Sequence, residues 1–155
     1  MPDHSPYQTL LAFDFGLRQI GVACGQTLTS AAKGLCIVKA SDGIPNWDTL
    51  GALINEWKPN LLLVGLPLNM DDSESDLSHL ARKFARRLHG RFSIETLMVD
   101  ERLTSRDIKA SLREENISAS GKRKRKRTDL SQIDHLAAAL ILQSWLDNPQ
   151  LGQQP

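Results

Sequence analysis

The stretch TLLAFDFGLRQIGVACGQ, residues 9–26, decides how the fold of this chain is interpreted. Residues 9–15 form an apolar run typical of a buried strand, GLRQ has the composition of a turn, and residues 20–25 form a second strand-like run. Asp14 places a carboxylate inside the first run, where its neighbours indicate a core. A strand-end aspartate commonly accepts hydrogen bonds from turn amides, and that role is sufficient for Asp14 taken alone.

The rest of the chain predicts an α/β fold with a five-stranded mixed sheet flanked by helices. Short connections make the first three strands an antiparallel meander, and the last two strands, reached through helices, are expected to be parallel. The run LLLVGL is apolar throughout, as in a strand that is buried on both faces. The expected strands cover residues 9–15, 20–25, 34–40, 61–66 and 94–99. The expected helices cover residues 46–57, 74–88, 104–115 and 130–146.

Length and composition indicate one globular domain. The chain has 155 residues, of which 41% are apolar and 24% charged. We expect the domain at residues 9–147, with a disordered N-terminus at 1–8 and a disordered tail at 148–155. No apolar stretch is long enough to cross a membrane and no signal pattern is present, which predicts a cytoplasmic protein without a membrane partner.

The two cysteines, Cys24 and Cys36, lie in apolar strand-like segments. We interpret them as reduced core thiols, with a disulfide between neighbouring strands as the alternative. Without a nearby histidine cluster they make a poor zinc site. No interface signal in the sequence separates a monomer from a homodimer.

A run of six cations, KRKRKR, interrupts an otherwise acidic chain. The run consists of Lys122, Arg123, Lys124, Arg125, Lys126 and Arg127. Outside the run, the chain has 13 of its 19 basic residues and all 18 acidic residues, which gives a net charge of −5 there. A concentrated cationic block favours a polyanionic partner, although a solvated loop is equally compatible with the run considered alone. Its place between two expected helices favours a phosphate-contacting loop over a targeting signal.

Carboxylates stand at the ends of expected strands and in the last helix. Asp14 ends the first strand, Asp100 and Glu101 follow the fifth, and Asp134 shares a helix face with Ala137, Ala138 and Ile141. Ligand sites of open α/β sheets lie outside the carboxyl ends of strands, where these acids are expected to meet. Clustered carboxylates repel one another, and a hard divalent cation such as Mg²⁺ or Mn²⁺ relieves that repulsion.

Each acid has an ordinary structural alternative when it is taken singly. Asp100 or Glu101 can pair with Arg102, and Asp134 can stabilise a helix N-terminus. All of these acids at one sheet edge, beside a cationic loop, favour a metal-dependent phosphodiesterase. The sequence leaves open whether Asp100 or Glu101 faces the metal.

Four motifs resemble the YqgF/RuvX family, a bacterial branch of the RNase H-like, Holliday-junction-resolvase-like superfamily. They are LAFDFGLRQIGVACG, LLLVGLPLNMD, DERLTS and IDHLAAALIL, which occur in this order over residues 9–146. The resemblance implies an RNase H-like fold and a divalent-metal nuclease that matures the 5′ end of pre-16S ribosomal RNA, with a DNA-junction resolvase as the alternative. At the matching motif positions, the resemblance implies that Asp14, Glu101 and Asp134 are catalytic metal ligands, with Asp100 beside Glu101. This chain departs from the family pattern at Asp72, where a glycine is usual.

Other residues near these acids are candidates for contacting nucleic acid. Arg18 and Arg102 are placed to hold a phosphate or to neutralise the carboxylates, and Asn69 to contact substrate or to serve a turn. The run 122–127 would bind backbone phosphates without reading bases. Three other classes remain as alternatives: a non-catalytic nucleic-acid-binding module, an ATP-binding relative of the sugar-kinase and actin type, and a structural interaction protein. The second needs two such domains, and this chain supplies one.

Overall fold

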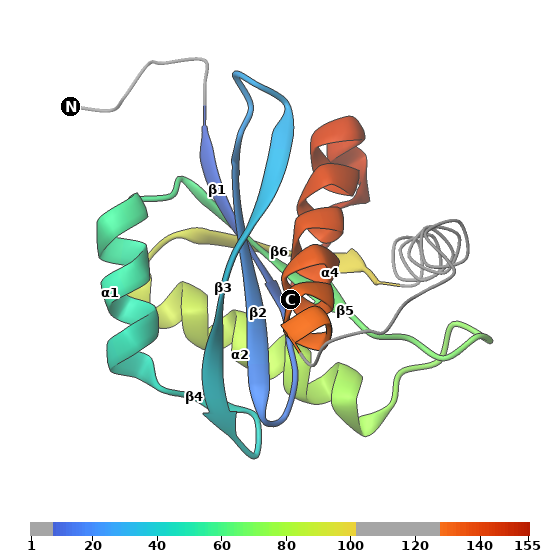
Figure 1. Cartoon of the computed structure of the whole chain (residues 1–155). Coiled ribbons are helices and arrows are strands. Elements are labelled where there is room, and N and C mark those ends of the chain that lie inside the picture. Colours follow the sequence, from blue (N-terminus) through green and yellow to red (C-terminus); the bar gives the residue numbers. More distant parts are fainter. Residues whose placement is uncertain (1–7, 102–127) are drawn as a thin grey trace, which may run out of the picture.

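The computed structural model describes residues 8–101 and 128–155, with the side chains of 128–135 excepted (Figure 1). The strands are β1 (Thr9–Asp14), β2 (Gln19–Gln26), β3 (Ala31–Ser41), β4 (Ile44–Pro45), β5 (Leu61–Leu66) and β6 (Glu95–Asp100). The helices are α1 (Trp47–Trp57), α2 (Asp76–Phe92), α4 (Thr128–Asp147) and the short 3₁₀ helix η1 (Pro149–Leu151).

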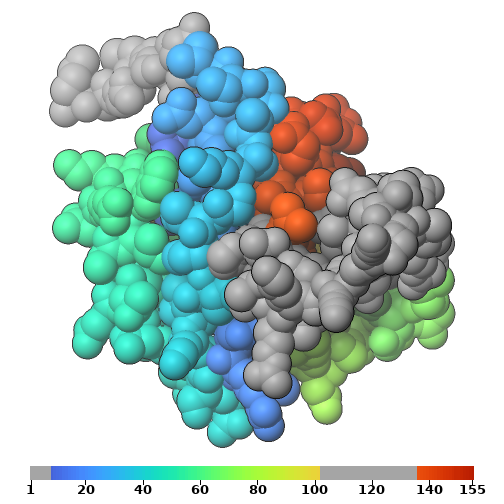
Figure 2. All heavy atoms as spheres, in the orientation of Figure 1, coloured from blue at the N-terminus to red at the C-terminus, as the bar shows by residue number. Residues whose placement is uncertain are grey.

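The described strands form one mixed sheet in the order β4-β3-β2-β1-β5-β6. β1, β2 and β3 pair antiparallel, whereas β5 and β6 run parallel to β1. This arrangement confirms the expected fold class of three antiparallel and two parallel strands with flanking helices. β3 is longer than predicted and lies exposed between α1 and α4 in the space-filling view (Figure 2).

The expectation of five strands is wrong by one short strand, β4. Ser41 and Ile44 pair across a two-residue turn in which Asp42 and Gly43 both have positive φ, at 52° and 84°. Such turns match the twist of antiparallel strands and favour the sequence Asp-Gly. The sequence pattern showed only the turn, because a two-residue strand that ends in proline has no alternation of its own.

Helices cover both faces of the sheet and divide the core in two (Figure 1). One cluster, centred on Phe13, Val64 and Phe84, lies between the sheet, α1 and α2. The other, which includes Ala12, Leu63 and Ile141, lies between the sheet and α4. The alternation of side chains along a strand therefore places successive residues under different helices.

Side-chain caps fix where the helices of the α1 and α2 layer begin. Asn46 Oδ1 accepts hydrogen bonds from the backbone N–H groups of Asp48 and Thr49, at 3.1 and 3.2 Å, which confirms the predicted start of α1. α2 starts at Asp76, two residues later than predicted, because Ser75 forms a capping box with Ser78. α2 also continues past the predicted end at residue 88 to Phe92.

The expectation of a disordered tail at 148–155 is wrong. Gln153 and Met98 exchange two backbone hydrogen bonds of 2.7 and 2.9 Å, so the tail pairs with the outer edge of β6. Gly152 permits this approach, because an added Cβ would lie 2.8 Å from Leu97 Cδ1. The tail thus occupies polar groups that an edge strand otherwise leaves unpaired.

Several predictions fall on residues that the structure does not describe. They are the N-terminus at 1–7, the helix at 104–115 and the basic run at 122–127. Gln8 is ordered, because its N–H donates to Thr27 Oγ1 at 2.8 Å. Cys24 and Cys36 are both free thiols. Within 8–101 and 128–155, no helix has the length and apolar content to cross a membrane.

Candidate active site

Side-chain alternation along β1 decides the face on which Asp14 lies. Leu10 and Ala12 belong to the cluster under α4, whereas Leu11 and Phe13 belong to the opposite cluster. Asp14 follows Ala12 by two residues, so it lies on the α4 face. It is half-buried and lines a hollow of about 470 Å³ formed with the turn that follows β1.

Gly65 lies beside Asp14 on the neighbouring strand. Leu61 and Leu63 belong to the cluster under α4, and Gly65 is the next residue of β5 on that face. β1 and β5 pair in parallel with Phe13 opposite Val64, which brings Gly65 next to the end of β1. Bare backbone therefore lies beside Asp14 at the carboxyl edge of the sheet.

The carboxylate of Glu101 lies over this bare backbone. A Cβ added to Gly65 would lie 2.8 Å from Glu101 Oε1 and 2.6 Å from Ile141 Cδ1. The Glu101 N–H donates to the Leu66 carbonyl at 3.0 Å, which extends the β5–β6 ladder by one residue. Glu101 is half-buried, and its Oε1 is fully buried. Asp14, at the end of β1, and Glu101, just after the end of β6, therefore lie on the two sides of Gly65.

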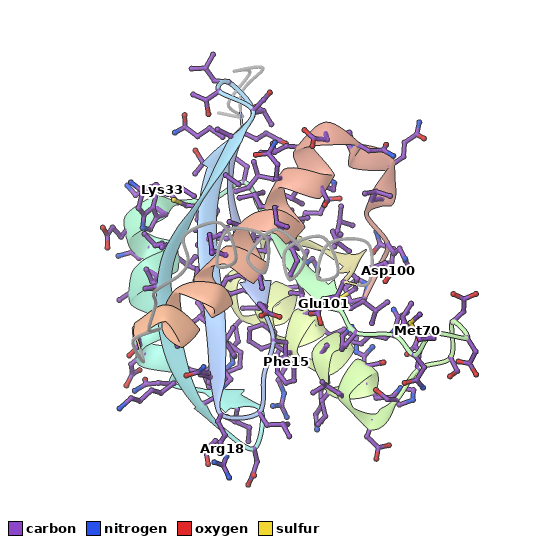
Figure 3. All side chains as sticks on the ribbon, turned by 45° about the vertical axis from the view of Figure 1, so that its right-hand side comes forward. Phe15, Arg18, Lys33, Met70, Asp100 and Glu101 are labelled. Atoms are coloured by element: carbon purple, nitrogen blue, oxygen red, sulfur yellow. The ribbon has the colours of Figure 1, made fainter. Side chains whose placement is uncertain are left out.

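Asp100 lies on the other face of the sheet. Val99 belongs to the cluster under α4 and Met98 to the opposite cluster. Because side chains alternate along a strand, Asp100 lies on the face of Met98 and Glu101 on the face of Val99. Figure 3 shows Asp100 and Glu101 where β6 ends, and Phe15 and Arg18 where β1 ends. Of the two acids between which the sequence did not decide, Glu101 thus shares the face of Asp14.

α4 carries Asp134 at its N-terminal end. Asp134 precedes Ile141 by seven residues, which is about two turns, so both are on one side of the helix. The Ile141 side chain packs over Gly65. The backbone of Asp134 belongs to α4, but its side chain lies outside the described residues. Among the described side chains, no three of His, Cys, Asp or Glu are grouped closely enough to hold a metal ion.

The nucleic-acid candidates differ in position. Arg18 is exposed and lines the same hollow as Asp14. The Asn69 side-chain amide donates to Ser73 Oγ at 2.9 Å, within the loop between β5 and α2. The structure thus uses that amide group in a turn. Arg102 and the run 122–127 lie outside the described residues.

Sequence reasoning missed Gly65 as a part of the site. The signal was a single glycine within the apolar run LLLVGL, because an isolated glycine inside a strand often marks the close approach of another group. The apolar pattern of this run by itself predicts only a buried strand.

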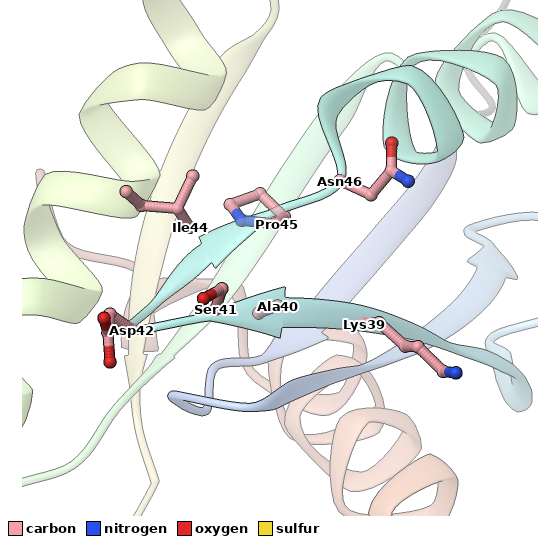
Figure 4. Close-up of a pocket in the computed structure, with 7 residues that line it drawn as sticks. All are labelled: Lys39, Ala40, Ser41, Asp42, Ile44, Pro45 and Asn46. Carbon is pink, nitrogen blue, oxygen red and sulfur yellow. The ribbon is translucent and has the colours of Figure 1, made fainter.

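A second hollow, of about 530 Å³, lies where the β3–β4 hairpin meets the start of α1 (Figure 4). Its lining residues are Lys39, Ala40, Ser41, Asp42, Ile44, Pro45 and Asn46. Asp42 is the one carboxylate among them, so this hollow does not have the paired acids found beside Gly65.

The family described as "RuvX: Holliday junction resolvase" matches residues 8–148, almost the entire chain. The chain belongs to the RuvX family. This membership confirms the resemblance inferred from the four motifs and the expected class of enzyme, a nuclease that hydrolyses phosphodiester bonds.

Curated RuvX relatives are similar over their full length. A protein of Pasteurella multocida (strain Pm70) is 48% identical over 92% of this chain and 97% of its own length. A protein of Acinetobacter baylyi (strain ATCC 33305 / BD413 / ADP1) is 47% identical over 100% of both chains. Both carry the name "Putative pre-16S rRNA nuclease".

Solved structures with the same fold are more distant in sequence. The structure described as "T. thermophilus RuvC in complex with Holliday junction substrate" has a TM-score of 0.50 and 14% identity. It covers 90% of this chain and 96% of that one. The structure described as "Thermus thermophilus RuvC structure" also has a TM-score of 0.50, with 12% identity over 94% and 98% of the two chains. At these identities the likeness supports the fold alone, and it agrees with the RNase H-like fold expected for a RuvX member.

Proposed function

We propose that this chain is a divalent-metal-dependent nuclease that matures the 5′ end of pre-16S ribosomal RNA. The observation that carries the proposal is the position of Asp14 and Glu101 on the two sides of Gly65, at the carboxyl edge of the sheet. The names of relatives that are almost half identical over 92% and 100% of the chain support the RNA substrate. This function places the chain in the bacterial cytoplasm, where ribosomal RNA is made.

The donor set fits a hard divalent cation. Carboxylate oxygens are preferred by Mg²⁺ and Mn²⁺, and the absent Cβ of Gly65 leaves room for the Glu101 carboxylate to approach the sheet. Asp14, Glu101 and Asp134 are the proposed ligands, and the first two stand at the ends of hydrogen-bonded strands. One or two bound ions would supply an activated water and stabilise the leaving oxygen of an in-line displacement.

The residues of the chain itself would position the substrate. Arg18 is exposed in the hollow that Asp14 lines, so its guanidinium can hold a phosphate next to the carboxylates. The engagement of the Asn69 amide with Ser73 favours a turn role for Asn69 over a substrate contact. Arg102 follows Glu101 directly in the sequence and is a second proposed phosphate ligand.

The substitution Asp14→Asn tests the proposed function. It removes the charge at nearly constant volume, so the fold should be kept while metal-dependent cleavage is lost. Purified protein is incubated with labelled pre-16S RNA and Mg²⁺ or Mn²⁺, and ribosomal RNA 5′ ends are mapped in depleted cells complemented with either protein. Full cleavage by the variant, or mature 5′ ends in cells that contain only the variant, would overturn the proposed site.

A second candidate function is the resolution of branched DNA. The description of the matching family favours it, because that description names a Holliday junction resolvase. The two functions are distinguished by incubating the same enzyme with a four-way DNA junction and with pre-16S RNA at equal concentrations. Symmetric junction cleavage without RNA cleavage would replace the RNA proposal with this one.

A further inference from the structure

The outer face of α2 carries a row of cations, which we call the α2 basic stripe: Lys83, Arg86, Arg87 and Arg91. Lys83, Arg87 and Arg91 follow one another at intervals of four residues, so they lie on one side of the helix. Four residues span about 6 Å of helix, so the stripe extends over roughly 12 Å. Arg87 is half-buried, and the other three side chains are exposed.

These cations have no carboxylate partners within the described part of the chain. The ion pairs given by the described residues join Glu74 to Arg82 and to His79, and neither pair includes a residue of the stripe. Glu95 lines a hollow together with Arg86 and His89, but no ion pair connects them. The positive charge of the stripe is therefore not neutralised by a described neighbour.

Packing fixes one member of the stripe in place. The guanidinium carbon of Arg91 lies 4.1 Å from the centroid of the Trp47 ring, an arrangement that orients the cation and leaves its charge in place. The same tryptophan stacks on Phe84, whose ring lies 6.2 Å away in the core beneath α2. The C-terminal end of the stripe thus packs on an aromatic pair that reaches into the core.

The chemistry of the surface favours phosphates over an apolar partner. Guanidinium groups present parallel N–H donors that match phosphate oxygens. None of the large apolar side chains that are exposed in the described residues belongs to α2. Protein interfaces usually contain buried apolar or aromatic anchors, and helices that lie in membranes present an apolar face. A cationic surface without either is suited to a nucleic-acid backbone.

We propose that the α2 basic stripe is a second contact surface for the phosphate backbone of the nucleic-acid substrate. This inference rests on the proposed function, because the partner is the same RNA. α2 lies on the opposite face of the sheet from α4, Asp14 and Glu101, so one short strand does not reach both surfaces. A substrate that contacts both must pass around the sheet edge, which selects long or structured RNA.

The first test measures binding without cleavage. Lys83, Arg86 and Arg87 are changed together to Gln, and Arg91 is kept because its loss would also disturb Trp47. The control changes Lys33, Lys39 and Lys58 to Gln, which removes the same charge from exposed positions outside α2. Dissociation constants for structured RNA are measured with EDTA over a range of salt concentrations.

The stripe variant should bind RNA roughly tenfold or more weakly at low salt, with a salt slope lower by about 2 to 3. The control variant should retain most of the wild-type slope. Equal slopes in the two variants would overturn the proposal. So would loss of binding to vesicles rich in anionic lipid with RNA binding intact, because the stripe would then serve a membrane surface.

Substrate length separates this proposal from the proposed function. The stripe variant should cleave a short strand that covers only the carboxylate edge as fast as the wild type, and a long structured RNA more slowly. If neither the wild type nor the stripe variant cleaves any RNA, the nuclease proposal fails. The binding measured with EDTA still tests whether the α2 basic stripe contacts RNA. Equal slowing on short and long RNA would overturn the second surface.

Discussion

Gly65 has no side chain, and its neighbours show why none fits. An added Cβ would lie 2.6 Å from Ile141 Cδ1 and 2.8 Å from Glu101 Oε1, closer than real Cβ contacts. The Ile141 side chain can move a little, whereas a displaced Glu101 carboxylate would leave the position beside Asp14. We expect Gly65→Ala to destabilise the fold by about 1–3 kcal/mol and to abolish metal-dependent cleavage.

Gly90→Ala is a matched control for this substitution. Gly90 lies in α2, and an added Cβ would meet no atom within 4 Å. Alanine inside a helix stabilises by about 0.5–1 kcal/mol relative to glycine, so this variant should be more stable and fully active. Chemical denaturation and cleavage assays compare both variants with the wild type. Wild-type cleavage by folded Gly65→Ala would contradict the placement of Glu101 in the site.

Glu101 and Asp100 should differ sharply in their effect on catalysis. Glu101 shares the α4 face with Asp14, whereas Asp100 lies on the opposite face. Loss of a residue that only supports a metal ligand costs 10–100-fold, so loss of a ligand itself should cost about 100-fold or more. We expect that loss for Glu101→Gln and near wild-type cleavage for Asp100→Asn. Mg²⁺ binding by calorimetry is the second readout, and a reversed order in both assays would exchange the roles of the two acids.

At the residue scale, the sequence singles out the candidate acids but not the face of the sheet on which each one lies. Asp14 was conspicuous because a carboxylate interrupts an apolar run. The choice between Asp100 and Glu101 depends on where β6 ends and on which face each residue lies. Side-chain alternation gives that answer only when the register of β6 against β5 is known.

At the scale of elements, one ion pair joins the loop after β5 to α2. Arg82 Nε donates to both Glu74 carboxylate oxygens at 3.0 Å, and its Nη1 donates to the Gln154 carbonyl at 3.2 Å. The hydrogen bond from Arg82, followed by the charge of Arg82, holds the pKa of Glu74 below its ordinary value of 4.5. Arg82 therefore connects α2 with the loop that precedes it and with the C-terminal segment.

Because the pKa of Glu74 is lower in the folded chain, the stabilisation from its charge is present above pH 4.5 and is lost as the pH falls through the lower folded value. The wild type should therefore have a larger free energy of unfolding than Glu74→Gln at pH 7, and the difference should shrink toward zero at a pH well below the lowered pKa of Glu74. Denaturant unfolding of both proteins at the two pH values measures this. A difference that stays constant with pH would contradict the pairing.

The C-terminal segment should protect the edge of β6. Removing residues 152–155 deletes both backbone hydrogen bonds between Gln153 and Met98, each worth about 0.5–1.5 kcal/mol. We expect a lower unfolding free energy and faster hydrogen exchange at the Met98 amide. The Leu63 amide, in the centre of the sheet, is the internal reference. Unchanged protection at Met98 would mean that the pairing does not persist in solution.

The sequence did not reveal this pairing, because the tail is short and polar and lacks strand alternation. An isolated bridge needs only one residue with a free N–H and C=O beside an edge strand, and such a residue leaves no composition signal. By contrast, the helix over 128–147 and the central strands were predictable because their apolar residues repeat over many positions.

At the scale of the whole molecule, charge is distributed unevenly between an acidic body and the cationic run 122–127. The run supplies six of the 19 basic residues, and without it the net charge is −5. A polyanion is therefore attracted to particular regions of the chain and repelled by the rest. Proteins of this kind bind nucleic acid with a strong dependence on salt, because each phosphate contact releases a counterion.

Replacing all six cations of 122–127 with Gln should reduce the slope of log affinity against log salt. Each cation that contacts a phosphate contributes about 0.7 to 0.9 to that slope, so a run that is fully engaged contributes about 4 to 5. RNA binding is measured with EDTA at several salt concentrations, and circular dichroism verifies folding. The affinity in high salt should change little, because salt removes most of the favourable free energy that the run contributes by releasing counterions. An unchanged slope in a folded variant would remove the run from the binding surface and leave the α2 basic stripe and Arg18 as its cationic part.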